Sequence, residues 1–151
     1  MKTYFPDINV LIAAAREDHN THIPAKTWLA QAALDARNGM CKVTLPMVVV
    51  AGFLRIVTHT KIMNPPNSPL EALSYISALL DLLQITVGEA QTWEPFQTLV
   101  ARQQLGGNDV PDAWLASYCL ATGAVVVTFD KGFKKLLPRS QVMLLSRARK
   151  I

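Results

Sequence analysis

Hydrophobic and polar positions along the chain follow two alternating patterns. Short apolar runs predict buried strands at 2–6, 41–45, 84–87, 124–129 and 141–145. Longer stretches with apolar residues at helical spacing predict helices at 8–15, 24–37, 46–57, 69–83, 89–104 and 109–122. Strands therefore alternate with helices along the whole chain. This alternation predicts a three-layer α/β domain with a largely parallel sheet.

Local signals place several of these boundaries. The segment 46–57 is ambiguous, because three consecutive valines favour a strand whereas its length and the proline at its start favour a buried helix. We predict a helix there. Ser68 and Glu71 form a capping-box pattern that starts the next helix. Gly123 ends the helix that precedes the 124–129 strand.

Length and composition limit the class of protein. The chain has 151 residues, of which 50% are hydrophobic and 17% charged, and this composition suits one domain spanning 1–151. Cys41 and Cys119 stand far apart, without a CxxC pair, so we expect two buried thiols in a reducing compartment. The longest apolar run, 45–54, is too short to cross a bilayer. We therefore expect a cytoplasmic protein with no membrane segment.

The formal net charge of +4 hides an uneven distribution. Residues 1–130 carry 8 Lys or Arg and 11 Asp or Glu, which gives −3, whereas residues 131–151 carry 7 Lys or Arg and no acid, which gives +7. A basic segment of this kind attracts a phosphate backbone, although basic chain ends are often simply solvated.

Candidate chemistry lies where the predicted strands end. Asp7 follows the first strand and Asp130 follows the 124–129 strand, so both reach the carboxyl edge of the sheet where ligands bind in such folds. Asp112 lies in the first turn of the helix that leads into the 124–129 strand. Each aspartate alone suits a helix start or a turn. Together they would repel one another unless a cation lay between them, and oxygen ligands without His or Cys suit Mg²⁺ or Mn²⁺.

Three segments resemble the motif blocks of a known family. FPDINVLIAAAR (5–16), VVVAGFLRIVTH (48–59) and NDVPDAWLASYCLATGAVVVTFDKGF (108–133) are similar to those of PIN-domain ribonucleases, and in particular of VapC-type toxins of bacterial toxin–antitoxin systems. The resemblance covers essentially the entire chain. It implies a PIN-like sheet of about five parallel strands, cleavage of RNA with Mg²⁺ or Mn²⁺, a homodimer, and inhibition by a cognate antitoxin.

The resemblance also implies roles for individual residues. Asp7, Asp112 and Asp130 match the acids that bind the metal and carry catalysis. Asn9 matches the polar residue that supports the site from the first helix. Thr128 lies where the family often keeps a hydroxyl, and an ordinary strand threonine explains it equally well. His19, His22 and His59 fit no metal-ligand spacing with a neighbouring acid.

One position departs from the family pattern. Many PIN nucleases carry a glutamate in the middle helix where this chain has Gly52. Two functions therefore stay open for a PIN domain: a Mg²⁺-dependent endoribonuclease toxin that cuts structured RNA such as tRNA or rRNA, and a catalytically silent domain that binds RNA or a protein. A third function, a phosphate-handling hydrolase with Asp7 as covalent nucleophile, is disfavoured because Asn9 replaces the second acid of the D-x-D motif that such enzymes use. Asp109 is a possible substitute for the missing glutamate, although we favour a helix-capping role for it.

Two kinds of surface are candidates for binding macromolecular partners: a cluster of lysines and two apolar helices. Lys131, Lys134 and Lys135 directly follow Asp130, so we expect them to contact the RNA backbone. The apolar helices at 24–37 and 70–83 are candidate surfaces for an antitoxin or a second copy, although core packing explains most of their hydrophobic residues.

Overall fold

The computed structural model describes residues 1–82, 86–88 and 92–146. Its sheet has five strands in the order β3-β2-β1-β4-β5, and every neighbouring pair is parallel. The strands are β1 (Lys2–Pro6), β2 (Cys41–Pro46), β3 (Thr86–Gly88), β4 (Val125–Thr128) and β5 (Val142–Leu144). The predicted α/β class, the parallel sheet and the five strands are confirmed.

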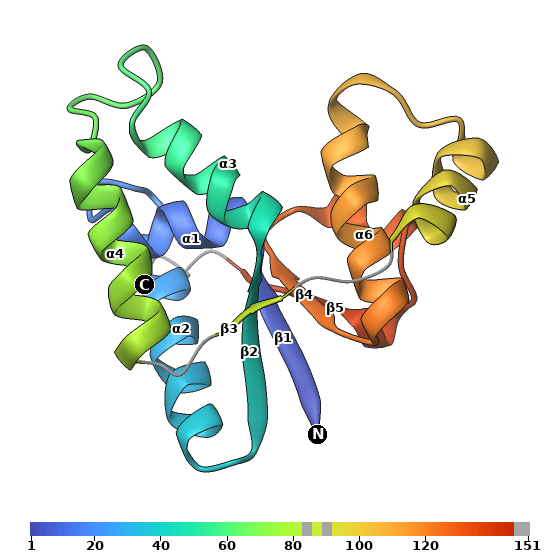
Figure 1. The fold of residues 1–151 in the computed structure, drawn as a ribbon, viewed down its shortest axis with the longest axis horizontal. Coiled ribbons are helices and arrows are strands. Elements are labelled where there is room, and N and C mark those ends of the chain that lie inside the picture. Colours follow the sequence, from blue (N-terminus) through green and yellow to red (C-terminus); the bar gives the residue numbers. More distant parts are fainter. Residues whose placement is uncertain (83–85, 89–91, 147–151) are drawn as a thin grey trace.

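Helices cover both faces of the sheet (Figure 1). They are α1 (Ile8–Ala15), α2 (His22–Arg37), α3 (Met47–Val57), α4 (Pro69–Leu82), α5 (Trp93–Gln103) and α6 (Val110–Thr122), with 3-10 turns η1 (Gly107–Asp109), η2 (Lys131–Lys135) and η3 (Arg139–Gln141). Helices α1 to α4 lie on one side and α5 and α6 on the other (Figure 1). Right-handed crossovers explain this division. The chain moves one way across the sheet from β1 through β2 to β3, and α5 and α6 lie in the connection that returns in the opposite direction from β3 to β4.

Most element boundaries agree with the sequence-based predictions. The ambiguous 46–57 segment is a helix, with Pro46 as its N-cap. The capping box is present, since Glu71 N donates to Ser68 Oγ at 3.1 Å and Ser68 N donates to Glu71 Oε1 at 3.3 Å.

Three boundaries differ from the predictions by more than one residue. Helix α2 begins at His22 rather than residue 24, because the His22 ring contacts the carbonyl of Ala13 and ties the helix start to α1. Helix α5 begins at Trp93, and the predicted start at 89–91 lies outside the described residues. The predicted strand at 84–87 is observed as Thr86–Gly88, with 84 and 85 outside the described residues.

The core lies between the sheet and its helices and holds the strand ends in place. Phe5 on β1 is fully buried and meets the ring of Tyr118 on α6 edge-on, with centroids 5.3 Å apart. Cys41 and Cys119 are buried free thiols, as predicted. No helix within the described residues is long and apolar enough to cross a membrane.

Candidate active site

Strands β1 and β4 end side by side at the carboxyl edge of the sheet. Pro6 pairs with Val127, and the backbone N–H of Asp7 donates to the Val127 carbonyl at 2.8 Å. Asp7 and Asp130 therefore follow two adjacent strands. Both lie at the carboxyl edge of the sheet, as the sequence analysis predicted. This edge is where ligands bind in parallel α/β sheets.

Thr128 links these two aspartates. Its Oγ1 is fully buried with the rest of the side chain and donates to Asp7 Oδ2 at 2.9 Å. The same oxygen accepts a hydrogen bond from Asp130 N at 2.9 Å. The other oxygen of Asp7, Oδ1, caps α1 by accepting from Ile8 N at 2.7 Å. Thr128 thus sets the orientation of one acid and the backbone position of the other.

Asp130 is held by a turn of its own. Its Oδ1 accepts from Gly132 N at 2.7 Å, which caps the start of η2. Asp130 therefore has both of the roles considered from the sequence. It belongs to a turn, which fixes one carboxylate oxygen, and it lies at the edge of the site, because it follows the end of β4.

Asp112 reaches the same place from α6. Burial raises its pKa to about 7, and the negative charges of Asp7 and Asp130 add to this rise. A hydrogen bond with Asp130 raises the pKa of Asp112 further, because it is formed by the protonated carboxyl. The structure therefore brings together the three acids that the sequence singled out.

Burial also raises the pKa of Asp7, which is 6% exposed. Hydrogen bonds from Thr128 and Ile8 oppose this rise, and the nearby Asp130 charge adds to it. Burial and neighbouring negative charge thus make ionisation of both Asp7 and Asp112 unfavourable. A bound cation would remove this cost.

Asn9 lies in the first turn of α1, two residues after Asp7. Its Oδ1 is buried and has no hydrogen-bond partner within the described part of the chain. Asn9 lines a cavity of about 450 Å³ with Lys131 and Phe129, the residues on either side of Asp130. His19, which the sequence did not implicate, lines the same cavity, and its Nδ1 accepts from Thr21 N at 3.2 Å. His19 lies in an irregular loop between α1 and α2, so the hydrophobic pattern of the sequence could not place it at a cavity.

The donor set fits a hard divalent cation. Carboxylates and the amide oxygen of Asn9 are the ligand types that Mg²⁺ and Mn²⁺ prefer, and Asn9 Oδ1 still lacks a partner. In the described residues, no group of three or more His, Cys, Asp or Glu side chains is already arranged to hold a metal ion. Asp112 and Asp130 are instead paired through a proton, which metal binding to carboxylates would displace.

Comparison with known proteins identifies the fold family. Residues 4–136 match the PIN domain. The chain belongs to the PIN-domain family. This PIN domain is 34% identical to ribonuclease VapC43 of Mycobacterium tuberculosis H37Rv over 132 residues, which cover 85% of this chain and 86% of that relative. The VapC-type resemblance is thereby confirmed.

Solved structures agree on the fold of this PIN domain. VapBC2 from Rickettsia felis, bound to a DNA fragment from its promoter, has a TM-score of 0.66 at 20% identity and covers 95% of this chain and 99% of its own. VapBC-1 from nontypeable Haemophilus influenzae has a TM-score of 0.59 at 13% identity, covering 94% of this chain and 97% of its own.

Asp109 in this PIN domain does not cap α6 as expected. It occupies the N-cap position, yet its side chain makes no capping hydrogen bond because its backbone is already helical. It is exposed and lines a cavity of about 280 Å³ together with Asp112 and Lys135. Its charge contributes to the raised pKa of Asp112. The capping prediction was therefore wrong, and Asp109 adds negative charge beside the cluster.

Gly52 lies where α3 packs closely on α1. A Cβ atom at this position would lie 2.5 Å from Cδ1 of Ile8, the residue that follows Asp7. The absence of a side chain thus allows a close contact directly beside the acid cluster. The Ile8 side chain occupies the space into which a glutamate at residue 52 would begin to extend.

The lysines predicted to bind RNA point in different directions. Lys131, Lys134 and Lys135 are all exposed on η2, and each lines a different cavity. Lys131 borders the cavity of Asn9, and Lys135 borders that of Asp112. The third cavity also contains Arg139, which the sequence showed only as part of a basic segment.

Proposed function

We propose that this protein is a Mg²⁺- or Mn²⁺-dependent endoribonuclease that cuts structured RNA such as tRNA or rRNA. The observation that carries the proposal is the cluster of Asp7, Asp112 and Asp130, delivered from β1, α6 and β4 to one edge of the sheet. The ribonuclease names of its relatives, including VapC43 and VapC31 of Mycobacterium tuberculosis, support this activity.

When bound, a divalent cation would activate a water molecule for attack on a phosphodiester and neutralise charge that develops on the phosphate. The chain's own residues prepare the site. Ile8 and Thr128 orient the Asp7 carboxylate, which leaves one lone pair on each oxygen for a ligand. Gly132 fixes one oxygen of Asp130. Lys131 and Lys135 lie in the adjoining cavities, where they can neutralise the RNA backbone.

Cleavage of purified RNA tests this proposal. The protein should cut tRNA or an rRNA hairpin with Mg²⁺ or Mn²⁺ and should not cut with EDTA. Asp7→Asn should abolish cleavage. Asp81→Asn is a matched control, because Asp81 is exposed on α4, away from the cluster. If Asp7→Asn cuts as well as the parent, the mechanism is wrong.

A second function is favoured by Gly52. In a PIN domain without the glutamate that many PIN nucleases carry in the middle helix, the three aspartates would serve to bind RNA or a protein without cutting. In that case, RNA would bind with measurable affinity in Mg²⁺ and stay intact over hours, for the parent and for Asp7→Asn alike. Metal-dependent cleavage by the parent would reject this function.

We also propose that a cognate antitoxin inhibits the protein by docking on α2 and α4. The solved relatives are VapBC and FitAB assemblies, which supports a partner protein. Leu70 and Leu73 on α4 are 74% and 51% exposed, and an apolar cavity of about 240 Å³ lies nearby between Leu29 on α2 and Tyr75 on α4.

An apolar segment of an antitoxin would cover these side chains. Leu73→Asp should therefore weaken capture of the protein encoded by the adjacent small gene and leave RNA cleavage unchanged.

We propose further that the protein is a homodimer in the cytoplasm. Light scattering on the purified protein should give twice the mass of one chain, and the mass of a single chain would reject the dimer.

A further inference from the structure

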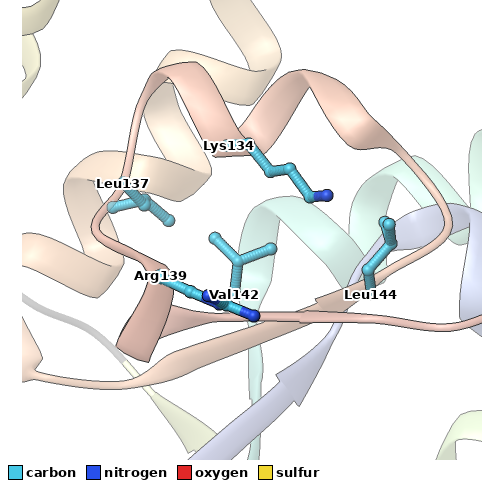
Figure 2. A pocket seen from close by; sticks show the side chains of 5 residues that line it. All are labelled: Lys134, Leu137, Arg139, Val142 and Leu144. Carbon is cyan, nitrogen blue, oxygen red and sulfur yellow. The ribbon is translucent and has the colours of Figure 1, made fainter.

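A third cavity lies between η2, η3 and the edge strand β5. It has a volume of about 480 Å³ and is lined by Lys134, Leu137, Arg139, Val142 and Leu144. Figure 2 shows Lys134 reaching in from η2 and Arg139 lying near β5, with Val142 between them. The cavity thus combines two cationic side chains with an apolar floor. Its size lies within the range of small-molecule pockets, about 300–1,000 Å³.

The walls of this cavity are firmly anchored. Gln141 Nε2 donates to the carbonyls of Cys119 at 2.7 Å and Ala124 at 3.1 Å, which ties η3 to α6 and to the start of β4. Phe133 and Leu137, which precede and follow Lys134 in the sequence, are buried and hold η2 against the core. Val142 pairs with Val126 at the edge of the sheet. The cavity is therefore a preformed part of the fold.

The chemistry of the lining residues favours a nucleotide. Lysine and arginine bind phosphate, and a guanidinium also stacks on the face of a base. The apolar side chains of Val142 and Leu144 offer a surface for a base or ribose. Residues 131–146 carry Lys131, Lys134, Lys135 and Arg139 and no acidic residue, so the surroundings attract a polyanion.

The cavity lies close to the acid cluster. Lys134 follows Asp130 by one 3-10 turn and a further residue, a distance of about 8 Å along the chain at the usual rise of a 3-10 helix. Leu144 lines both this cavity and the cavity of Asn9, so the two adjoin. An RNA strand with one phosphate at the acids could therefore place a neighbouring nucleotide here.

We propose that this cavity is a nucleotide subsite that holds an RNA residue flanking the cleaved phosphodiester, with Lys134 and Arg139 on its phosphate and Val142 and Leu144 against its base or sugar. This inference rests on the proposed ribonuclease function. It adds Arg139 and the apolar floor to the lysines as determinants of RNA binding.

Binding measured in EDTA tests the subsite without cleavage. Anisotropy of a labelled single-stranded RNA should show weaker binding for Lys134→Ala and Arg139→Ala, and each variant should make the slope of log Kd against log salt shallower by about 0.7. Val142→Phe keeps both charges and fills the cavity, so it should also weaken binding. Lys42→Ala and Leu73→Phe are matched controls, because Lys42 lies near the amino end of β2 and Leu73 lies on α4. Thermal melting confirms that each variant folds.

Nuclear magnetic resonance locates the ligand. Adenosine monophosphate added to the labelled protein in EDTA should shift the amide signals of Val142 and Leu144, and inorganic phosphate should shift those of Lys134 and Arg139. The inference is overturned if Val142→Phe and Arg139→Ala bind RNA as tightly as the two controls. It is also overturned if a hexaglutamate peptide, and not the nucleotide, shifts Val142 and Leu144, which would make the cavity a peptide site.

Cleavage assays separate this inference from the proposed function. If the parent cuts RNA with Mg²⁺ and Arg139→Ala binds and cuts equally well, the subsite fails and the nuclease stands. If the parent binds RNA through the cavity and never cuts, the nuclease function fails.

Discussion

The acid cluster makes the stability of the metal-free protein depend on pH, and Asp112→Asn isolates this effect. The pKa of Asp112 rises from 3.8 to about 7 on folding, chiefly through burial and then through the charges of Asp7 and Asp130. The folded state therefore holds a proton that the unfolded state releases between about pH 4 and pH 7. Stability from this group is fully present below pH 4 and is lost as the pH rises through 7.

The pKa difference sets the size of this loss. At about 1.4 kcal/mol per pKa unit, a rise of roughly three units corresponds to at most about 4 kcal/mol. Asp112 is only half-buried, so screening by solvent reduces the expected loss to about 1–2 kcal/mol. Asparagine cannot ionise. In EDTA, Asp112→Asn should therefore be more stable than the parent by about 1–2 kcal/mol at pH 8, and this advantage should vanish at pH 4.

Urea unfolding followed by tryptophan fluorescence measures this difference. A second series with Mg²⁺ should stabilise the parent, by about 2.7 kcal/mol at 100 times the dissociation constant, and should stabilise Asp112→Asn much less. Asp81→Asn provides the control, because its carboxylate is exposed on α4. The reasoning fails if the parent and Asp112→Asn lose stability in parallel between pH 4 and pH 8, or if Mg²⁺ stabilises both equally.

Three further predictions follow from the packing of the site. Thr128→Val keeps the side-chain volume but removes the hydrogen bond to Asp7, so the free energy of unfolding should fall by about 1–3 kcal/mol and cleavage should slow, whereas Thr128→Ser should retain both. Gly52→Glu should cost about 1–3 kcal/mol in urea unfolding, because its Cβ meets Ile8, and a double-mutant cycle with Ile8→Ala should show coupling above 0.5 kcal/mol; additive effects would contradict the close contact. Burial raises the pKa of Cys119 to about 12, so a thiol reagent at pH 8 should leave Cys119 unmodified until the protein unfolds, as mass spectrometry would show.

The order of strands and helices was predictable because each has its own hydrophobic period. The segment 46–57 was the hardest to assign, because its three valines favoured a strand and its length favoured a helix. The proline before Met47 correctly marked a helix start. The three acids were predictable as well, because Asp7 and Asp130 follow strands whose carboxyl ends meet at one edge. Parallel topology converts such sequence positions into spatial proximity.

Features that depend on packing between distant segments were not predictable. Thr128 was equally well explained as an ordinary strand residue, and only the pairing of β1 with β4 shows that its hydroxyl contacts Asp7. Asp109 had a good capping signature, yet the preceding 3-10 turn gives it a helical backbone and removes that role. Arg139 belonged to a uniformly basic segment. Its place in a cavity depends on Gln141, which reaches two carbonyls far away in sequence.

The central claim is that Asp7, Asp112 and Asp130 together hold the divalent cation used in RNA cleavage. Crystals of the protein soaked in Mn²⁺ test it most directly, through the anomalous signal of the metal. We predict a peak in contact with carboxylate oxygens of this cluster, at about 2.0–2.2 Å, and loss of the peak and of RNA cleavage in Asp7→Asn. RNA cleavage by the parent without a peak at this cluster, or with a peak elsewhere, would contradict the account.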